Sequence, residues 1–183
     1  MNRRRLLRVT AAAGAWLLLT AHSPYRQWEA HRKMRLVVLV SAAEQPSVAL
    51  GSALALIYTQ RLPESRAIMA RARDTNDAVR LIASKQLDVA LLRTADAYAA
   101  AAGEAPYADS GAPRLRALAL LGDYVFVCRD DLPVAAAYML TEALAEHWRD
   151  IDPPLVGAAP GPRPPNTLAV PLHPGALEYY RDH

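Results

Sequence analysis

Residues 74–92, DTNDAVRLIASKQLDVALL, constrain the fold more than any other part of the chain, because they predict a helix that runs into a buried strand. Ala78, Val79 and Ile82 recur at a spacing that places them on one helical face. Thr75 is expected to cap this helix, since its hydroxyl can accept from a free N–H of the first turn. The helix therefore has one apolar face that needs a sheet to cover it.

The end of the same stretch predicts the strand. Lys85 is expected to close the last helical turn, where a cation suits the negative end of the helix dipole. Residues 87–92 are apolar except at Asp88, which is typical of a strand covered on both faces, as in parallel sheets. The stretch is thus half of a βαβ unit.

Strands and helices alternate around this unit. Strands are predicted at residues 36–40, 66–72, 115–121 and 124–128, and helices at 47–60, 94–102 and 134–148. The alternation predicts an α/β domain with a mostly parallel sheet flanked by helices. We expect one core to bury ten residues together: Leu36, Val38, Leu50, Leu54, Val79, Ile82, Val89, Leu91, Leu118 and Leu120.

Charge and cysteine content narrow the function classes. The net charge of +3 depends on four arginines near the N-terminus, and without them 17 basic residues stand against 18 acidic ones, a balance of −1. A nucleic-acid partner is therefore not expected. The single cysteine, Cys128, excludes an intramolecular disulfide and is interpreted as a small apolar residue in a strand.

The N-terminus predicts export. A basic start at residues 2–8 precedes an apolar run of 13 residues at 9–21, whereas a spanning helix needs about 20. Residues 1–21 are therefore interpreted as a signal peptide or an uncleaved signal anchor, and the sequence leaves both open. Residues 22–35 would form a charged stalk. The expected location is the periplasm, with the protein either soluble or tethered to the inner membrane.

Three further segments follow the stalk. Residues 36–150 are expected to form the α/β lobe. Residues 151–168 are interpreted as a proline-rich linker, since six of the 14 prolines lie between 152 and 165. Residues 169–183 are expected to pack on the lobe, because Leu172 and Tyr179 would otherwise be exposed.

A series of short motifs resembles a known family. They are LG at 50–51, ALA at 53–55, LDVAL at 87–91, DAY at 96–98, Gly103, PY at 106–107, LRALA at 115–119, VPLHPGA at 170–176 and YY at 179–180. In order and spacing they resemble the solute-binding subunits of TRAP transporters of the TAXI type. The resemblance covers most of residues 36–183. It implies a periplasmic-binding-protein-like fold and a TRAP permease as a partner.

The resemblance also implies a missing part. Receptors of that family hold their ligand in a cleft between two lobes, whereas here the chain passes from residues 129–131 almost directly into the helix at 134–148. The segment that would form the second lobe is absent, so a single lobe is expected. The candidate ligand-binding residues are Ser41, Arg73, Thr75, Asn76 and Tyr98. A helix N-terminus with nearby arginines suits a carboxylate, so the implied ligand is a small organic anion.

Signatures of other chemistries were not found. The chain has no P-loop, no GxGxxG, no HExxH, no CxxC and no GxSxG motif. We therefore expect no enzyme, no catalytic residues, no metal and no cofactor. Two functions stay open. One is an exported solute receptor for a small carboxylate. The other is a degenerate receptor lobe that acts as a protein-interaction module of the envelope without transport, with a homodimer or another envelope protein as its complex.

Overall fold

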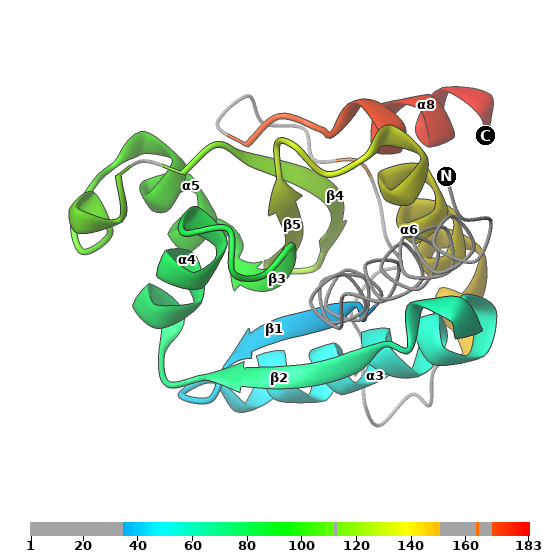
Figure 1. Cartoon of the computed structure of the whole chain (residues 1–183), viewed down its shortest axis with the longest axis horizontal. Helices are drawn as coiled ribbons and strands as arrows, with labels where there is room; N and C mark the ends of the chain where they lie inside the picture. Colours follow the sequence, from blue (N-terminus) through cyan, green and yellow to red (C-terminus); the bar gives the residue numbers. More distant parts are fainter. Residues whose placement is uncertain (1–34, 112, 151–163, 165–169) are drawn as a thin grey trace, which may run out of the picture. The chain divides into compact units, whose positions relative to one another are not determined.

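The computed structural model describes residues 35–111, 113–150, 164 and 170–183. Within these residues the chain forms a five-stranded mixed sheet with helices on both faces, and the predicted α/β class is confirmed (Figure 1). The spatial order is β2-β1-β3-β5-β4. The strands are β1 (Val37–Ser41), β2 (Ile68–Ala72), β3 (Val89–Arg93), β4 (Leu115–Leu121) and β5 (Tyr124–Arg129).

Strand pairing changes from parallel to antiparallel at β3, the middle strand of the sheet. β1 pairs in parallel with both β2 and β3, whereas β5 pairs antiparallel with β3 and with β4. The antiparallel half follows from the two residues that join β4 to β5. Gly122 takes a positive φ of 62° there, the conformation that a tight hairpin turn requires. The central strands β1 and β3 are parallel, as the alternating pattern predicts.

The helices cover both faces of the sheet (Figure 1). α3 and α6 pack on one face, and α4 and α5 pack on the other. The longer helices are α3 (Gln45–Arg61), α4 (Thr75–Ala83), α5 (Thr94–Ala102), α6 (Val134–His147) and α8 (Pro174–Asp182). Short 3₁₀ turns occur at η1 (Pro63–Ser65), η2 (Ala108–Ser110) and η3 (Trp148–Asp150).

The core is divided by the sheet, and the prediction of one joint core was wrong. Successive side chains of a strand point to opposite faces, so Leu91 joins the cluster under α3 and α6, whereas Leu92 joins the cluster under α4 and α5. Val79 and Ile82 belong to that second cluster. Eight of the ten predicted core residues are buried, while Leu36 and Leu120 are only partly buried.

The ends of α4 differ from the prediction. Asp74 caps the helix through its side chain, and Thr75 is already the first helical residue. The helix ends at Ala83, so Lys85 lies beyond the last turn with a left-handed φ of 59°. Its N–H donates to the Ile82 carbonyl at 3.0 Å. Lys85 thus occupies the position after the helix that glycine usually fills.

The C-terminal segment covers the edge of β4. The Ala117 N–H donates to the Pro171 carbonyl and the His173 N–H donates to the Ala117 carbonyl, both at 2.9 Å. α8 then packs on α6. A Cβ on Gly175 would lie 2.1 Å from the Val134 carbonyl oxygen, so only glycine permits this approach of the two helices.

Several predicted segments lie outside the described residues. They are the signal peptide or anchor at 1–21, all but the last residue of the stalk at 22–35, and nearly all of the proline-rich linker at 151–168. Among the residues that are described, none of the helices has the length and apolar character needed to cross a membrane.

Candidate functional site

The predicted ligand residues gather at one edge of the sheet. β1, β2 and β3 run in the same direction, so their last residues, Ser41, Ala72 and Arg93, end at a common carboxyl edge. α3, α4 and α5 begin just beyond it. The chain leaves β1 towards β2 on one side, while β3 lies on the other side of β1. Such a switch point is where open α/β sheets bind ligands.

The five predicted residues occupy different depths at this edge. Ser41 is buried at the end of β1, and its hydroxyl has no hydrogen-bond partner among the described residues. Arg73 and Asn76 are exposed, and Thr75 is half-buried at the first turn of α4. Tyr98 lies in the second turn of α5, where it packs partly against the core. The edge therefore brings together Ser41 and the start of α4, with Tyr98 on the neighbouring helix.

The start of α4 is occupied by the protein's own carboxylates. Asp74 accepts a hydrogen bond from the Asp77 N–H at 2.8 Å, and its other oxygen lies 3.0 Å from Arg73 Nε. Asp77 accepts from the Arg73 N–H and forms an ion pair with Arg80. The Asp77 N–H and the Arg73 guanidinium lower the pKa of Asp74. The positive end of this helix is thus already neutralised from within the chain.

A second cluster joins loops across the switch point. Glu44, in the loop before α3, forms an ion pair with Arg93 at 3.1 Å. The Tyr124 hydroxyl donates to the same carboxylate at 3.2 Å, and the Arg93 guanidinium lies 5.6 Å from the Tyr124 ring centre. Burial and the nearby Glu44 raise the pKa of Tyr124. These contacts connect the β1–α3 loop to β3 and β5.

The DAY and PY motifs have a structural role in this fold. The Tyr107 hydroxyl donates to Asp96 Oδ1 at 2.7 Å, and Tyr107 is buried. Burial and this carboxylate raise the pKa of Tyr107. Asp96 thereby attaches the loop after α5 to the first turn of that helix.

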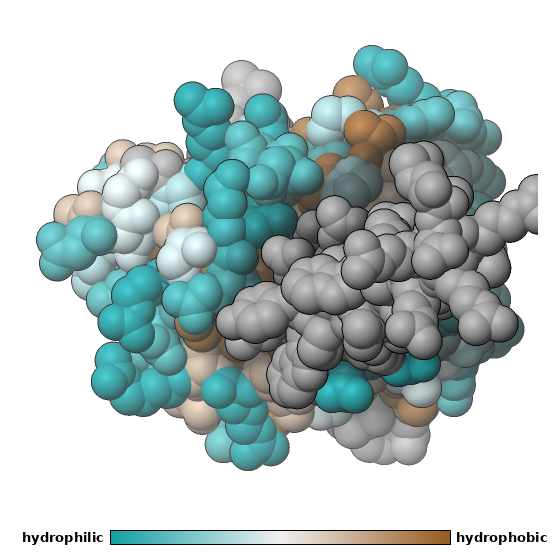
Figure 2. Space-filling view, viewed as in Figure 1, coloured by the Kyte–Doolittle hydropathy of each residue, from teal (hydrophilic) through white to brown (hydrophobic). Residues whose placement is uncertain are grey.

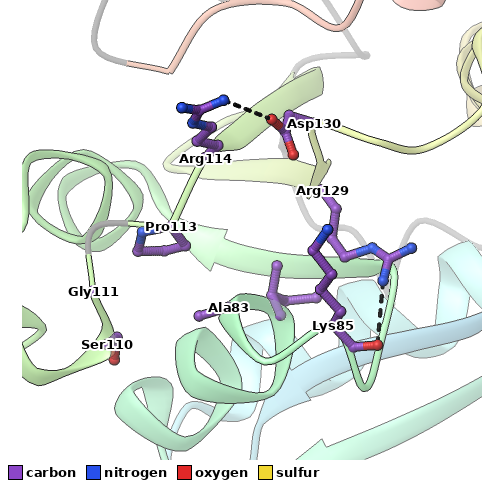
Figure 3. Close-up of a pocket in the computed structure, with 9 residues that line it drawn as sticks. Ala83, Lys85, Ser110, Gly111, Pro113, Arg114, Arg129 and Asp130 are labelled. Atoms are coloured by element: carbon purple, nitrogen blue, oxygen red, sulfur yellow. Dashed lines mark hydrogen bonds and ion pairs between the residues drawn. The ribbon is translucent and has the colours of Figure 1, made fainter.

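A hollow opens at the opposite edge of the sheet (Figure 3). We call it the amino-edge hollow, because it lies where β3 begins. Its volume is about 390 Å³. The end of α4, the loop around η2 and the neighbouring ends of β4 and β5 contribute its lining: Ile82, Ala83, Lys85, Ser110, Gly111, Pro113, Arg114, Arg129 and Asp130.

Ion pairs surround the amino-edge hollow. Lys85 Nζ lies 2.8 Å from Asp131, and Arg129 contacts Asp88 at 3.0 Å and Asp131 at 3.1 Å. An Arg129 N–H also donates to the Lys85 carbonyl at 3.2 Å. Arg129 Nε is buried and is not aligned for a hydrogen bond, although it lies within ion-pair distance of Asp131. Lys85 lowers the pKa of Asp131.

Sequence reasoning missed this hollow. Asp130 and Asp131 precede Leu132 and Pro133 just ahead of α6, and the first turn of α6 contains neither of them. Instead they pair with cations that follow α4 and precede β4. The run of opposite charges at Arg129, Asp130 and Asp131 was the only hint of this cluster in the sequence. Which residues pair with these aspartates depends on the neighbouring elements.

Metal ligands and the single cysteine bear on other kinds of chemistry in the part of the chain that the structure describes. Its side chains include no group of three or more metal-ligating residues. Cys128 is buried in β5, and burial raises the pKa of its thiol far above the usual value. Comparison with protein-family models and with curated proteins finds no match to the chain.

Proposed function

We propose that this protein is an envelope protein built on one lobe of a solute receptor, and that it acts by binding another protein at its carboxyl edge. The second lobe of a TAXI-type receptor would face that edge. In this proposal a partner protein takes the place of the missing lobe. A TRAP permease and a second copy of the chain both remain candidates for the partner.

The observation that carries the proposal is the internal pairing of charge at the carboxyl edge. Asp74 and Asp77 fill the start of α4, and Glu44 engages Arg93 and Tyr124. A solute carboxylate would have to displace these groups. A protein surface would not, because it can bind around them with polar side chains of its own.

Exposed polar residues at this edge suit such a partner. Figure 2 shows hydrophilic residues in teal, mixed with pale and tan ones, over the part of the view where β1 and β2 end in Figure 1. Arg73 and Asn76 are exposed at this edge. Apolar surface also appears near α8, and Val134 and Leu177 are among the exposed large apolar residues.

A crosslinking experiment tests the proposal. A photoreactive amino acid placed at Asn76, in cells that produce the full chain, should yield one discrete crosslinked product. The matched control is Glu64, which is also exposed but lies in η1, beyond the other end of α3. Crosslinking at Glu64 should give no such product. The proposal fails if Asn76 gives none, or if both positions give the same product.

A second candidate function is binding of a small carboxylate at the same edge. Ser41 favours it, because its buried hydroxyl has no partner within the described part of the chain and is available to a ligand. Calorimetry with succinate on the purified full chain separates the two functions. The interaction role predicts no heat at millimolar succinate. Heat that disappears in an Arg73→Gln variant would instead support the receptor role.

A further inference from the structure

The amino-edge hollow has two kinds of ion pair around it. Lys85–Asp131 and Arg129–Asp88 are close, at 2.8 and 3.0 Å, and join the loop between α4 and β3 to the end of β5. The pair of Arg114 with Asp130 is loose, with 4.0 Å between the nearest nitrogen and oxygen. The close pairs hold the walls of the hollow together. At this distance Arg114 and Asp130 do not hydrogen-bond to each other through their side chains, so the guanidinium and the carboxylate can bind other partners.

The backbone fixes Arg114 and Asp130 opposite each other. Arg114 directly precedes Leu115 and Asp130 directly follows Arg129, which are an antiparallel pair, and the Asp130 N–H donates to the Arg114 carbonyl at 3.1 Å. Figure 3 shows both side chains at the same end of the hollow, facing each other, with Arg129 and Lys85 farther from Arg114. The Arg114 side chain is 86% exposed and that of Asp130 is 31% exposed. A cation and an anion thus stand side by side, open to a ligand.

We infer that the amino-edge hollow binds a free α-amino acid with an apolar side chain. The ligand's carboxylate would accept hydrogen bonds from the Arg114 guanidinium, for which a two-pronged contact is the favoured geometry. Its ammonium group would donate to Asp130. The α-carbon of an amino acid places these two charges next to each other, as the side-by-side arrangement of Arg114 and Asp130 requires.

Part of the remaining lining suits the apolar part of such a ligand. Ala83 and Pro113 are half-buried and provide apolar surface within the hollow, whereas Ile82 lines it but is only 2% exposed. Its volume of about 390 Å³ lies in the range of small-molecule sites. This site lies at the opposite edge of the sheet from the proposed protein-binding surface, so it is independent of that function.

Matched ligands test the charge requirement. The purified full chain is titrated by calorimetry with L-leucine, with 4-methylpentanoate, which lacks the ammonium, and with 3-methylbutylamine, which lacks the carboxylate. L-leucine should bind with a dissociation constant at or below the low millimolar range. Each analogue should bind at least about tenfold more weakly, since each loses one charged hydrogen-bonding group. Equal binding of all three ligands, or no binding of L-leucine at 10 mM (a level set by roughly millimolar affinity), would overturn the inference.

Matched variants locate the site. Arg114→Gln and Asp130→Asn should each weaken L-leucine binding by about tenfold or more. Because both side chains reach solvent, these variants should keep the wild-type melting temperature, which circular dichroism checks. Arg73→Gln at the carboxyl edge should bind L-leucine like the wild type. The inference is wrong if Arg73→Gln loses binding, or if Arg114→Gln and Asp130→Asn keep it.

Discussion

His173 shows how one buried polar residue holds the C-terminal segment in place. Its Nδ1 accepts from the Gly175 N–H at 3.2 Å, which caps α8, and it also hydrogen-bonds to the Leu132 carbonyl. Since Nδ1 accepts, the other ring nitrogen must donate, and the imidazole must be neutral. Burial lowers the pKa of His173, and the Leu132 carbonyl opposes part of that shift. The PLHPGA motif is thus explained by packing.

The lowered pKa of His173 predicts a pH dependence of stability. The folded pKa lies below the unfolded value of about 6.5. The contribution of His173 is therefore complete above pH ~6.5 and is lost as the pH falls from there towards the folded pKa. Urea unfolding between pH 7.5 and 4.5 should show this loss. His173→Asn, which can still accept from Gly175, should show a smaller slope, and equal slopes in the two proteins would contradict the prediction.

At the scale of elements, the start of α4 separates two interpretations of the same sequence. Either Asp74 or Thr75 could have capped the helix, since both carry a side-chain oxygen that can accept from the first turn. The extended backbone of Asp74, with φ −149° and ψ 178°, makes it the cap. The chain is still extended at Asp74, two residues after the end of β2, and becomes helical only at Thr75.

The cap assignment predicts unequal effects of two adjacent substitutions. Asp74→Ala removes the acceptor of the Asp77 N–H and should lower the melting temperature by a few degrees. Thr75→Ala leaves that hydrogen bond intact and should change the melting temperature less. Thermal unfolding of the two variants at neutral pH measures the difference. The assignment is wrong if Thr75→Ala has the larger effect.

Truncating a leucine should cost more stability in the central strand β3 than in the edge strand β4. Leu91 lies on central β3 and is 1% exposed, whereas Leu120 lies on β4 and is only partly buried. Leu91→Ala should lower the free energy of unfolding by ~2–5 kcal/mol, as other buried large-to-small changes do. Leu120→Ala should cost clearly less. A loss below ~1 kcal/mol for Leu91→Ala would mean that β3 is not central to the core.

At the scale of the whole molecule, the C-terminal segment completes the described fold. It supplies two backbone hydrogen bonds to the outer edge of β4, and α8 covers α6. Buried Ala176 and Tyr179 add apolar contact. An edge strand left uncovered is a template for pairing with other chains.

Deleting residues 172–183 should therefore lower the melting temperature by several degrees, since about 1 kcal/mol moves it by ~2–8 °C in domains of this size. Light scattering should also detect more aggregation, because the deletion removes the His173 hydrogen bond to Ala117 and leaves only Pro171 against the edge of β4. The undeleted chain carrying Leu177→Ser is a control, since Leu177 is exposed and should matter little. An unchanged melting temperature after the deletion would contradict the structural role of the segment.

The sequence by itself determined the elements and the α/β class. Apolar periodicity locates β4 at residues 115–121 and α5 at 94–102, which are their observed bounds. Local signals suffice here because a buried strand or a helix face needs its own apolar pattern wherever it lies in the fold. The export signal and the TAXI resemblance are likewise sequence properties, and both stay predictions.

Only the tertiary structure decided which residues meet. The division of the core needed the pairing of β1 with β3, because that pairing sets which face each side chain occupies. The pairing of Glu44 with Arg93, and of Lys85 with Asp131, joins residues 49 and 46 positions apart. No local pattern encodes such contacts, since they depend on where the chain returns after each crossover. For the same physical reason, the sequence could offer candidate ligand residues such as Arg73 and Asn76, while the internal charge pairing of the carboxyl edge and the amino-edge hollow emerged only from the fold.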